Sequence, residues 1–297
     1  MVTTARTRGG YTPGELTVHT SPAAISQVTR ALKSAGRRIA LVPTMGALHE
    51  GHRELIRHAR LMPGAGVVAV SIFVNPLQLG PTEDLARYPR PLEADLQICR
   101  DEGVELVFAP SVDDMYPAGA TTTTVDPGPL GGELEGSVRP GHFAGVLTVV
   151  AKLFHIVAPD VAFFGEKDYQ QLVLVTKMVA DLNFPLAAVG VPTVREPDGL
   201  AVSSRNAYLS AAERQRAAVL HRALEAGRAA FAAGERDPVA VEAKARQLLE
   251  GAAGVEPDYV ALVDPDSFEQ AKQAAPGLVL ATAARVGRTR LIDNVIL

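Results

Sequence analysis

The sequence has few of the features that mark several large classes of protein. Of its 297 residues only Cys99 is a cysteine, so no disulfide can form within the chain, which fits a reducing compartment. The formal net charge of -4 argues against a protein that coats nucleic acid or another polyanion. Uncharged apolar runs fall well short of the ~18 residues that a membrane-spanning helix needs, and residues 1–15 contain no apolar signal segment. We therefore expect a cytoplasmic globular protein, and any phosphate that it handles should be small.

Two common nucleotide-binding fingerprints are also missing. The chain contains no Gly-Lys dipeptide, which the Walker A phosphate loop requires. Residues 64–69 match the dinucleotide-binding pattern in letters, but they precede a predicted strand, whereas the mechanism requires a glycine turn that follows one. We attribute this match to chance.

Short apolar segments alternate with amphipathic ones up to about residue 191. Strands are predicted where apolar or β-branched runs end at a turn residue, and helices where apolar residues recur three or four positions apart. This alternation is typical of an α/β fold, a Rossmann-like doubly wound parallel sheet with helices on both faces. The predicted strands are residues 38–42, 67–74, 104–109, 161–164 and 186–191, and the predicted helices are residues 21–36, a stretch after Gly51, and residues 95–102, 143–157 and 170–182.

The character of the chain changes near Val194. Beyond it, two alanine-rich amphipathic helices and three short strands are predicted, at residues 211–233, 238–251, 258–263, 278–284 and 289–296. We therefore predict two domains, a Rossmann-like domain over residues 1–193 and a smaller C-terminal α+β domain over residues 194–297. Residues 115–141 are rich in Thr, Gly and Pro, and so long an irregular segment is typical of a functional loop or lid.

The segment VPTMGALHEGH, residues 42–52, follows the first predicted strand. Gly46 and Gly51 permit close approach of the backbone, while His49 and His52 share one face where a helix begins. A helix N-terminus attracts phosphate, and two imidazoles can donate hydrogen bonds to phosphate oxygens as charge builds on them in a transition state. The alternatives are an ordinary turn with a capping histidine, or a zinc site, which lacks a third ligand nearby in the sequence.

Two later segments could also hold an anion. Lys167, in FGEKDYQQL, lies just past a predicted strand, and the chain has only six lysines against 23 arginines. Ser203, Ser204, Arg205 and Asn206 lie at the predicted domain junction and offer the donors that could grip a triphosphate. Each segment has a plainer interpretation, as a solvated charged turn and as a capped loop respectively.

Three amide side chains could bind a second substrate. Asn75 and Gln78, in SIFVNPLQLG, follow the second predicted strand, and Gln171 lies shortly after Lys167. An amide can orient a hydroxy acid because it donates to the carboxylate and accepts from the hydroxyl. The alternative is a turn with a surface glutamine.

Together, these segments resemble the pantoate:beta-alanine ligase family. VPTMGALHEGH is similar to that family's form of the HxGH signature of the nucleotidyltransferase superfamily, and VSSRN resembles its counterpart of the KMSKS loop. The resemblance includes FVNPLQLG, RPGHFAGVLTVVAKLF, FGEKDYQQL and LIDN, and so covers almost the whole chain. It implies that ATP activates pantoate as pantoyl adenylate, with loss of pyrophosphate, and that beta-alanine then displaces AMP to give pantothenate.

The resemblance also implies roles for individual residues. His52, His49 and Lys167 would be catalytic, with His52 as the proton donor. The residues that would bind pantoate are Gln78, Gln171 and Asn75, and Gln78 would also border beta-alanine. The residues that would contact or border ATP are Met45, Gly46, Ala47, Leu48, His49, Glu50, Gly51, His52, Gly165, Glu166, Lys167, Asp168, Val194, Val202, Ser203, Ser204 and Arg205.

Further expectations concern the metal, the lid and the assembly. Mg²⁺ would accompany ATP, with Asp95 as its candidate ligand, because Ala94 stands where some family members carry a second acidic residue. An acyl adenylate hydrolyses in water, so residues 115–141 and 195–206 are candidate lids, and the C-terminal domain would close over ATP. The family also implies a homodimer.

Two other classes of protein remain compatible with these motifs. One is a nucleotidyltransferase that acts on a phosphorylated substrate, since HxGH also serves there; it would be indifferent to beta-alanine. The other is a nucleotide-binding module without chemistry, which would bind ATP and form no AMP.

Overall fold

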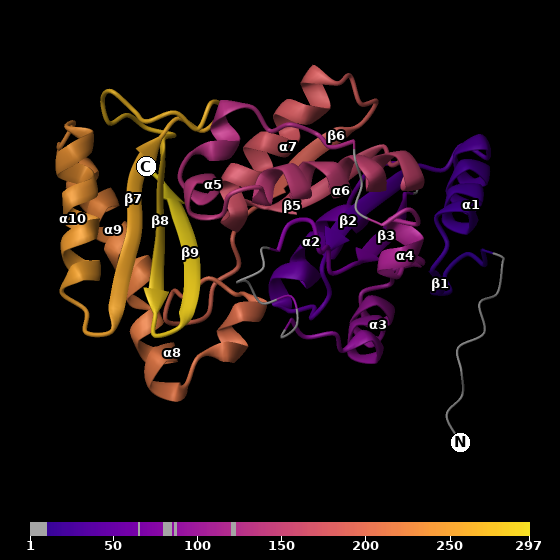
Figure 1. The fold of residues 1–297 in the computed structure, drawn as a ribbon, viewed down its shortest axis with the longest axis horizontal. Coiled ribbons are helices and arrows are strands. Elements are labelled where there is room, and N and C mark those ends of the chain that lie inside the picture. Colours follow the sequence, from indigo (N-terminus) through magenta and orange to yellow (C-terminus); the bar gives the residue numbers. More distant parts are fainter. Residues whose placement is uncertain (1–10, 65, 80–84, 86–87, 120–122) are drawn as a thin grey trace. The chain divides into compact units, whose positions relative to one another are not determined.

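The computed structural model describes residues 11–64, 66–79, 85, 88–119 and 123–297 (Figure 1). The chain divides into two compact units. The first comprises Met1–Gly132, Gly136–Gly165 and Leu174–Val191, and the second comprises Glu133–Glu135, Glu166–Val173 and Pro192–Leu297. The boundary at Val191 is close to the predicted one, but two short segments that were predicted to belong to the first domain are part of the second unit.

A six-stranded parallel sheet forms the centre of the first unit, in the order β1-β4-β3-β2-β5-β6. The strands are β1 (Thr17–His19), β2 (Ile39–Thr44), β3 (Val67–Ile72), β4 (Leu106–Phe108), β5 (Val161–Gly165) and β6 (Ala187–Val191). The predicted α/β fold is confirmed, although β1 was not predicted. From β2 the chain goes on to β3 and β4 on one side, while β5 and β6 lie on the other. Doubly wound sheets bind ligands at the carboxyl ends of strands where the order reverses in this way.

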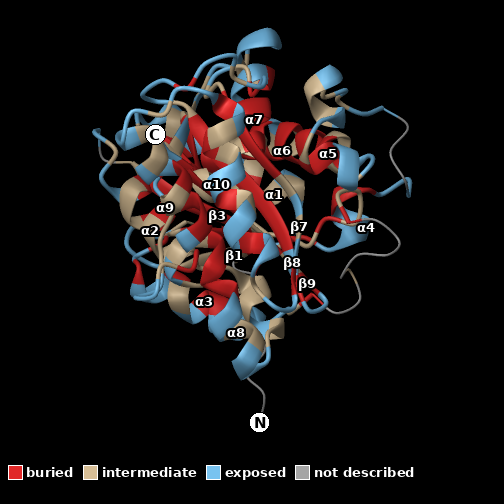
Figure 2. Cartoon of the chain, turned by 90° about the vertical axis from the view of Figure 1, so that its left-hand side faces the viewer, coloured by how far each residue is buried: buried red, intermediate tan, exposed pale blue. Residues whose placement is uncertain are grey.

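The first unit is covered by helices whose apolar stripes face the sheet. Leu55 and Ile56 of α2 pack into a cluster with Val42 and Val70 of the sheet, and Ile56 is fully buried. The helix α6 is buried along most of its length, as its apolar sequence predicts, and appears mostly red in Figure 2. The helices up to β6 are α1 (Pro22–Ser34), α2 (Glu50–Arg60), α3 (Leu92–Asp101), α4 (Val112–Met115), α5 (Glu135–Val138), α6 (His142–Val157) and α7 (Tyr169–Asp181), with 3-10 turns η2 (Pro129–Gly132) and η3 (Glu166–Asp168).

The three strands predicted for the C-terminal domain are present in the second unit and form an antiparallel sheet with β8 in the centre. Leu220 and Leu249, from α9 and α10, pack with Leu280 and Leu291 of the sheet in one apolar cluster. The predicted helix over residues 211–233 is two helices, because the chain turns at Ala218. The elements are η4 (Ser204–Tyr208), α8 (Ala211–Ala217), α9 (Val219–Ala232), α10 (Pro238–Glu250), β7 (Val255–Val263), β8 (Val279–Val286) and β9 (Thr289–Ile296).

Side-chain contacts explain why Glu133–Glu135 belongs to the second unit. The amide of Gln170 donates to the Glu133 carbonyl at 2.9 Å and accepts from the Glu135 N–H at 3.1 Å. On β9, Arg290 binds both carboxylate oxygens of Glu135 at 2.7 Å. Part of the segment predicted as a lid is therefore fixed to the C-terminal sheet, while its residues 120–122 lie outside the described part of the chain.

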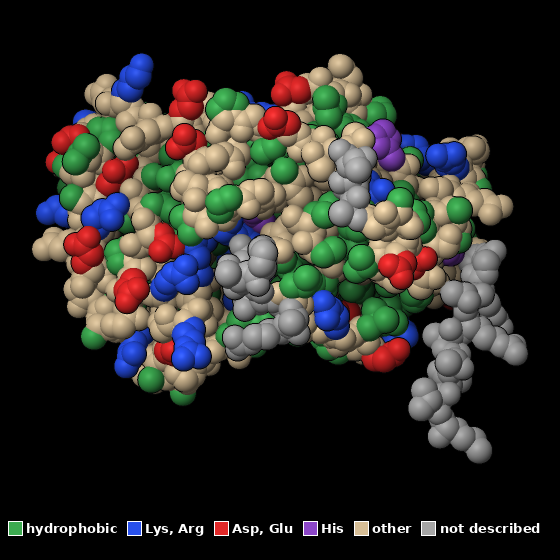
Figure 3. Space-filling view, in the orientation of Figure 1, with side chains coloured by type: hydrophobic (Ala, Val, Ile, Leu, Met, Phe, Trp, Pro, Cys, Tyr) green, Lys and Arg blue, Asp and Glu red, His purple; other side chains and the backbone are tan. Residues whose placement is uncertain are grey.

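Among the described residues, none of the helices has the length and apolar character that a bilayer crossing requires. On the face of the protein drawn in Figure 3, acidic and basic side chains of the described residues are intermingled.

Candidate active site

The turn between β2 and α2 depends on a glycine. Thr44 Oγ1 donates to the Ser71 carbonyl at 2.7 Å and accepts from the Gly46 N–H at 3.1 Å. Gly46 has a φ of 82°, and a Cβ there would lie 2.9 Å from Asp95 Oδ2. Any larger residue would therefore be strained in its backbone and would push against a buried carboxylate.

Asp95, in the first turn of α3, holds the next residues of this turn. Its Oδ2 accepts from the Ala47 N–H at 2.9 Å and its Oδ1 from the Leu48 N–H at 2.7 Å, and Asp95 is only 1% exposed. Burial raises the pKa of Asp95, and the two backbone N–H groups oppose this rise. The expectation that Asp95 binds Mg²⁺ stays a prediction; the contacts that the structure shows for both of its oxygens are to the backbone, so Asp95 also positions the turn.

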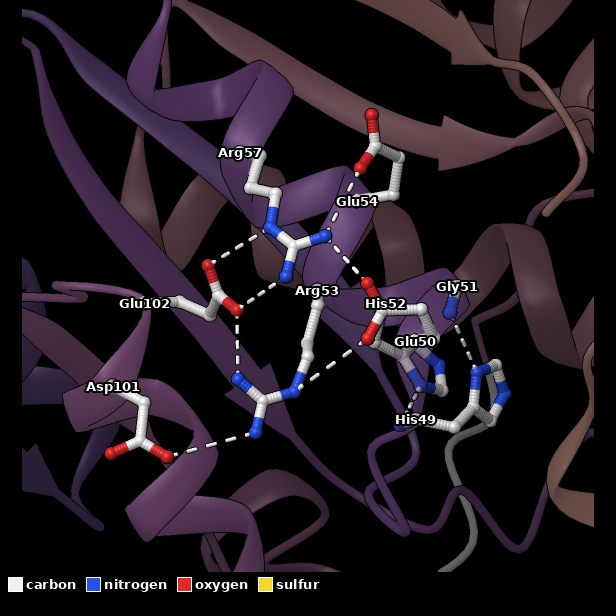
Figure 4. Close-up of polar contacts among 9 residues, drawn as sticks. All are labelled: His49, Glu50, Gly51, His52, Arg53, Glu54, Arg57, Asp101 and Glu102. Carbon is white, nitrogen blue, oxygen red and sulfur yellow. Dashed lines mark hydrogen bonds and ion pairs between the residues drawn. The ribbon is translucent and has the colours of Figure 1, made fainter.

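The histidine pair lies at the start of α2 (Figure 4). His49 is the N-cap, and its Nδ1 accepts from the Gly51 N–H at 3.2 Å. His52 Nδ1 accepts from the His49 N–H, also at 3.2 Å, and the two rings lie 4.0 Å apart between centroids. Since each Nδ1 acts as an acceptor, each neutral ring carries its proton on Nε2. The pair therefore presents two N–H donors at a helix N-terminus, where a phosphate would be bound.

The described residues do not support zinc at this pair. They contain no group of three or more His, Cys, Asp or Glu side chains that could hold a metal ion. The capping function of His49, one of the alternatives considered for the sequence, is present, and the same hydrogen bonds orient both rings.

An ionic network fixes α2 to the end of α3 (Figure 4). Glu102, which is 7% exposed, accepts from Arg53 Nη1 at 2.7 Å and from Arg57 Nη2 at 2.9 Å. Burial raises the pKa of Glu102, but the two arginines outweigh this effect, so that the pKa lies below its ordinary value of 4.5. The helix α3 thus holds the histidine segment twice, through Asp95 at its start and Glu102 after its end.

We expect Glu102→Gln to lower the melting temperature at pH 7, because the charge-assisted bonds to two arginines are weakened by about 1–2 kcal/mol. A carboxylate whose pKa is lowered by folding stabilises the fold above its ordinary pKa, and this contribution is lost as the pH falls through the lowered value. The difference between the variant and the wild type should therefore be full at pH 7 and shrink as the pH falls below 4.5. Differential scanning calorimetry at several pH values measures it.

Glu54→Gln is the matched control, because Glu54 faces Arg57 on the rim of the same network at 3.4 Å and is 35% exposed. It should shift the melting temperature less than Glu102→Gln does at pH 7. Equal shifts for the two variants, or a Glu102→Gln effect that is independent of pH, would contradict this account.

Asn75 and Gln78 lie in one amide cluster after β3. Asn75 is fully buried and donates to Gln78 Oε1 at 3.0 Å and to the Gly145 carbonyl at 3.1 Å. Its Oδ1 accepts from the Leu77 N–H at 3.2 Å and the Tyr116 hydroxyl at 2.8 Å. These bonds use the two donors and both lone pairs of the amide. The expectation that Asn75 binds pantoate stays a prediction; in the structure all of its hydrogen-bonding groups are used within the protein, and one of its bonds places Gln78.

Gln78 connects the amide cluster to the histidine turn. Its Nε2 lies 3.1 Å from Met45 Sδ, and its backbone carbonyl lies 2.8 Å from His142 Nδ1. A Cβ on Gly145 would lie 2.2 Å from the Leu77 carbonyl oxygen, so only glycine lets α6 pass so close to this turn. The first unit therefore brings Gln78 against Met45, which belongs to the same turn as the histidine pair. Gly80, the last residue of the motif FVNPLQLG, lies outside the described residues.

Lys167 lies in the second unit, in the 3-10 turn η3. Its Nζ is 3.7 Å from Asp168 Oδ2, and its side chain is 16% exposed. The Asn294 amide donates to the carbonyls of Glu166 and Lys167, at 2.8 and 3.0 Å. Gln171, the predicted partner amide, is partly exposed, whereas its neighbour Gln170 is 3% exposed and binds the backbone.

The serine loop also belongs to the second unit. The Val202 N–H donates to the Val194 carbonyl at 2.9 Å, so the residues before the serines form a narrow hairpin. Ser203 caps η4, since its Oγ accepts from the Arg205 N–H at 3.3 Å, and Asn206 Nδ2 donates to the Ala201 carbonyl at 3.1 Å. A capped loop, the plainer interpretation of this segment, is therefore present. The capping hydrogen bond fixes the backbone of Arg205 relative to the Ser203 side chain.

Sequence reasoning missed the residues that hold these loops. Arg195 makes a two-pronged ion pair with Asp293, at 2.7 and 2.9 Å. Asp293 and Asn294 are the last two residues of LIDN, one of the motifs that carry the resemblance. The sequence offers no signal for their partners, which lie about a hundred positions away.

Comparison with known proteins identifies the family. The profile of the family described as pantoate-beta-alanine ligase matches residues 17–296. The chain belongs to this family. The ligase is 59% identical to the pantothenate synthetase of Mycolicibacterium smegmatis over 285 residues, 96% of this chain and 88% of the relative. It is 56% identical to that of Nocardia farcinica over 288 residues, 97% and 88% of the two chains.

Solved structures give the same assignment for the ligase fold. The pantothenate synthetase of Thermus thermophilus has a TM-score of 0.86 at 45% identity, covering 94% of this chain and 98% of that one. The pantoate-beta-alanine ligase of Francisella tularensis, complexed with beta-gamma ATP and beta-alanine, has a TM-score of 0.76 at 32% identity, with 95% and 97% covered. The resemblance inferred from the motifs is confirmed, and the chain is an enzyme of this ligase family.

Proposed function

We propose that this ligase condenses pantoate with beta-alanine through a pantoyl-adenylate intermediate. The pantoate carboxylate attacks the α-phosphorus of ATP and pyrophosphate leaves. The amine of beta-alanine then attacks the acyl carbon, AMP leaves, and the nitrogen loses a proton to give pantothenate. The observation that carries the proposal is the histidine pair at the N-terminus of α2, whose Nδ1 atoms accept from the backbone and so place the proton of each neutral ring on Nε2, a group that can donate to phosphate when ATP binds. The family match and the ligands of the Francisella relative support it.

Positioning and charge stabilisation supply the chemistry in this proposal, since displacement at phosphorus needs no covalent nucleophile from the protein. His49 and His52 stabilise charge on the phosphate oxygens, with His52 as the proton donor, and Lys167 binds the same phosphates. The remaining residues proposed to contact or border ATP are Met45, Gly46, Ala47, Leu48, Glu50, Gly51, Gly165, Glu166, Asp168, Val194, Val202, Ser203, Ser204 and Arg205. For Ala47 and Leu48 this contact does not use the backbone N–H, which Asp95 accepts.

Pantoate is proposed to bind through Gln78 and Gln171, and Gln78 also borders beta-alanine. Because an acyl adenylate hydrolyses in water, we further propose that the loop at residues 195–206 and the C-terminal unit close over the nucleotide. Residues 133–135, which are held by Gln170 and Arg290, would move with that unit.

Mg²⁺ is proposed to arrive bound to ATP rather than to a site on the protein. The described residues offer no preformed cluster of metal ligands, and the carboxylate of Asp95 is engaged by the backbone. A magnesium ion commonly keeps most of its waters and binds through substrate phosphates. We therefore propose that it enters as MgATP.

The assembly and location are further parts of the proposal. The strand β6 has one neighbour among the described strands, so its other edge offers backbone groups to a second chain. A homodimer, which light scattering would detect, fits this edge.

A cytoplasmic location fits a reaction that consumes ATP and a chain whose only cysteine, Cys99, is buried and unpaired.

We expect the purified chain to exchange labelled pyrophosphate into ATP only when pantoate is present, and to form AMP and pantothenate when beta-alanine is added. Pantoate-dependent exchange without beta-alanine would establish the adenylate as the first product. A nucleotidyltransferase for phosphorylated acceptors would instead be indifferent to beta-alanine, and a binding module would bind ATP without forming AMP. Either result would refute the proposed function.

A further inference from the structure

The motif LIDN supplies no residue to the proposed reaction, yet its last two residues are buried polar side chains. Asp293 is 3% exposed and Asn294 is 6% exposed, both on β9. Successive side chains of a strand point to opposite faces, so Asp293 shares a face with Leu291 and Val295, which pack in the core of the second unit. Asn294 points to the other face, as Arg290 does. Buried polar side chains need hydrogen-bond partners, and the partners of these two residues lie in loops distant in the sequence.

The amide of Asn294 fixes the backbone on both sides of Lys167. The carbonyls of Glu166 and Lys167, which accept from Asn294 Nδ2, belong to the two peptide planes that flank the Lys167 Cα. Holding both planes sets the backbone dihedrals of this residue, and so the direction of its Cα–Cβ bond. A single short 3-10 turn has few hydrogen bonds of its own, so the direction of Lys167 depends on this external amide.

The neighbouring residue holds the serine loop in the same way. Asp293 binds both terminal nitrogens of Arg195, whose Nη2 also donates to the Asn294 carbonyl at 2.9 Å. Arg195 Nη1 in turn donates to the Gly199 carbonyl at 3.0 Å, which closes the hairpin before Ser203. The Asn294 N–H donates to Asp293 Oδ1 at 2.8 Å, so the two adjacent residues form one connected network.

We propose that Asn294 is a positioning residue that aims Lys167 at the phosphates of ATP, next to Asp293, which anchors the serine loop from the other face of β9. The inference rests on the proposed function of Lys167 as a phosphate ligand. In this proposal the last two residues of LIDN hold two loops that are distant in the sequence, the turn at Lys167 and the serine loop. Because Asn294 touches the backbone of Lys167, its effect on catalysis should pass through the lysine side chain.

A double-mutant cycle tests this inference. Asn294→Ala removes both donors, and we expect it to lower pantoate-dependent pyrophosphate exchange roughly 10-fold, mainly through a higher KM for ATP, because a small displacement of a positioned group is enough to do so. In a Lys167→Ala background the same change should have no further effect beyond about 2-fold, since the group that it positions is gone. Multiplicative losses in the double variant would overturn the proposal.

Thr282→Ala controls for damage to the sheet. Thr282 is fully buried on β8, lies opposite Asp293 in the register, and donates to the Tyr259 carbonyl on β7 at 2.8 Å. It should lower the melting temperature by about as much as Asn294→Ala while leaving exchange within about 2-fold of the wild type. If Thr282→Ala raises the KM for ATP as much as Asn294→Ala does, Asn294 is merely structural and the proposal fails.

Failure of the proposed function can be told apart from failure of this inference. If the wild-type chain shows no exchange, the proposed function is wrong, and the same cycle is then measured as ATP affinity by calorimetry. A loss of affinity from Asn294→Ala that vanishes in the Lys167→Ala background would still support the positioning role. Equal losses in both backgrounds, or no ATP binding by the wild type, would refute it.

Discussion

Substituting alanine for His52 or for Lys167 is expected to lower the rate of pantoate-dependent pyrophosphate exchange by ~10²-fold or more, the scale of one preorganised electrostatic contact. His52 accepts the His49 N–H on Nδ1, so its neutral ring carries the proton on Nε2 and can act as a donor there. Alanine removes this donor and also the acceptor for the His49 N–H. Lys167 contributes a full positive charge, and no other residue of the turn η3 carries one.

The two losses should appear in different kinetic parameters. Lys167→Ala should raise the KM for ATP and lower kcat, since a charge on the phosphates acts in the ground state and the transition state. His52→Ala should act mainly on kcat, because the charge that it stabilises grows as pyrophosphate leaves. Initial rates at varied ATP, with pantoate saturating, separate these effects.

Two control variants test whether position matters rather than residue type. His58→Ala removes a histidine from the same helix, where His58 is 39% exposed and pairs with Glu54. Lys177→Ala removes an exposed lysine from α7. Both should keep exchange within about 2-fold of the wild type. Near-wild-type exchange in His52→Ala and Lys167→Ala would show that the assigned roles are wrong.

The sheet of the first unit could be predicted because its signal is local. Residues 39–42 and 67–70 are apolar on both faces, as buried parallel strands require, and each run ends at a turn residue. The short strand β1 could not be predicted, because three residues with a partly exposed pattern form a strand only by pairing with β4. The positions of His49 and His52 followed from the same local pattern.

The supporting contacts could not be predicted, because they join residues far apart in the sequence. Asp95 carries a carboxylate, the group that commonly binds metal ions. Only its hydrogen bonds from the Ala47 and Leu48 N–H groups show that it positions the turn. Asn75 has the chemistry of a substrate ligand, and only its four partners show that it is occupied. A residue type indicates what a side chain can bind, while the tertiary fold determines what it does bind.

The domain boundary shows the same limit. Composition changes near Val194, and a continuous division there was the simplest interpretation. Glu133–Glu135 and Glu166–Val173 belong to the second unit because Arg290, Gln170 and Asn294 bind them. No periodicity in either segment signals this, since the contacts come from side chains more than 30 positions away.

The second large effect is expected at Gln78. If its amide donates to the pantoate carboxylate, Gln78→Ala should raise the KM for pantoate roughly 10- to 100-fold, the value of a hydrogen bond to a charged group. The KM for ATP should change much less. The melting temperature should fall less than in Asn75→Ala, because only one buried group, the Asn75 Nδ2–H that donates to Gln78 Oε1, loses its partner.

Asn75 is expected to behave differently, because it positions Gln78 rather than binding the substrate. Asn75→Ala would leave the Gly145 carbonyl, the Leu77 N–H and the Tyr116 hydroxyl without their buried partner, at about 1–3 kcal/mol for each group that stays unpaired. It should therefore both raise the KM for pantoate and lower the melting temperature. Tyr116→Phe removes only one of these bonds and should produce a smaller change of the same kind in both measurements. A Asn75→Ala variant with wild-type stability and a raised KM for pantoate would instead make Asn75 a direct ligand.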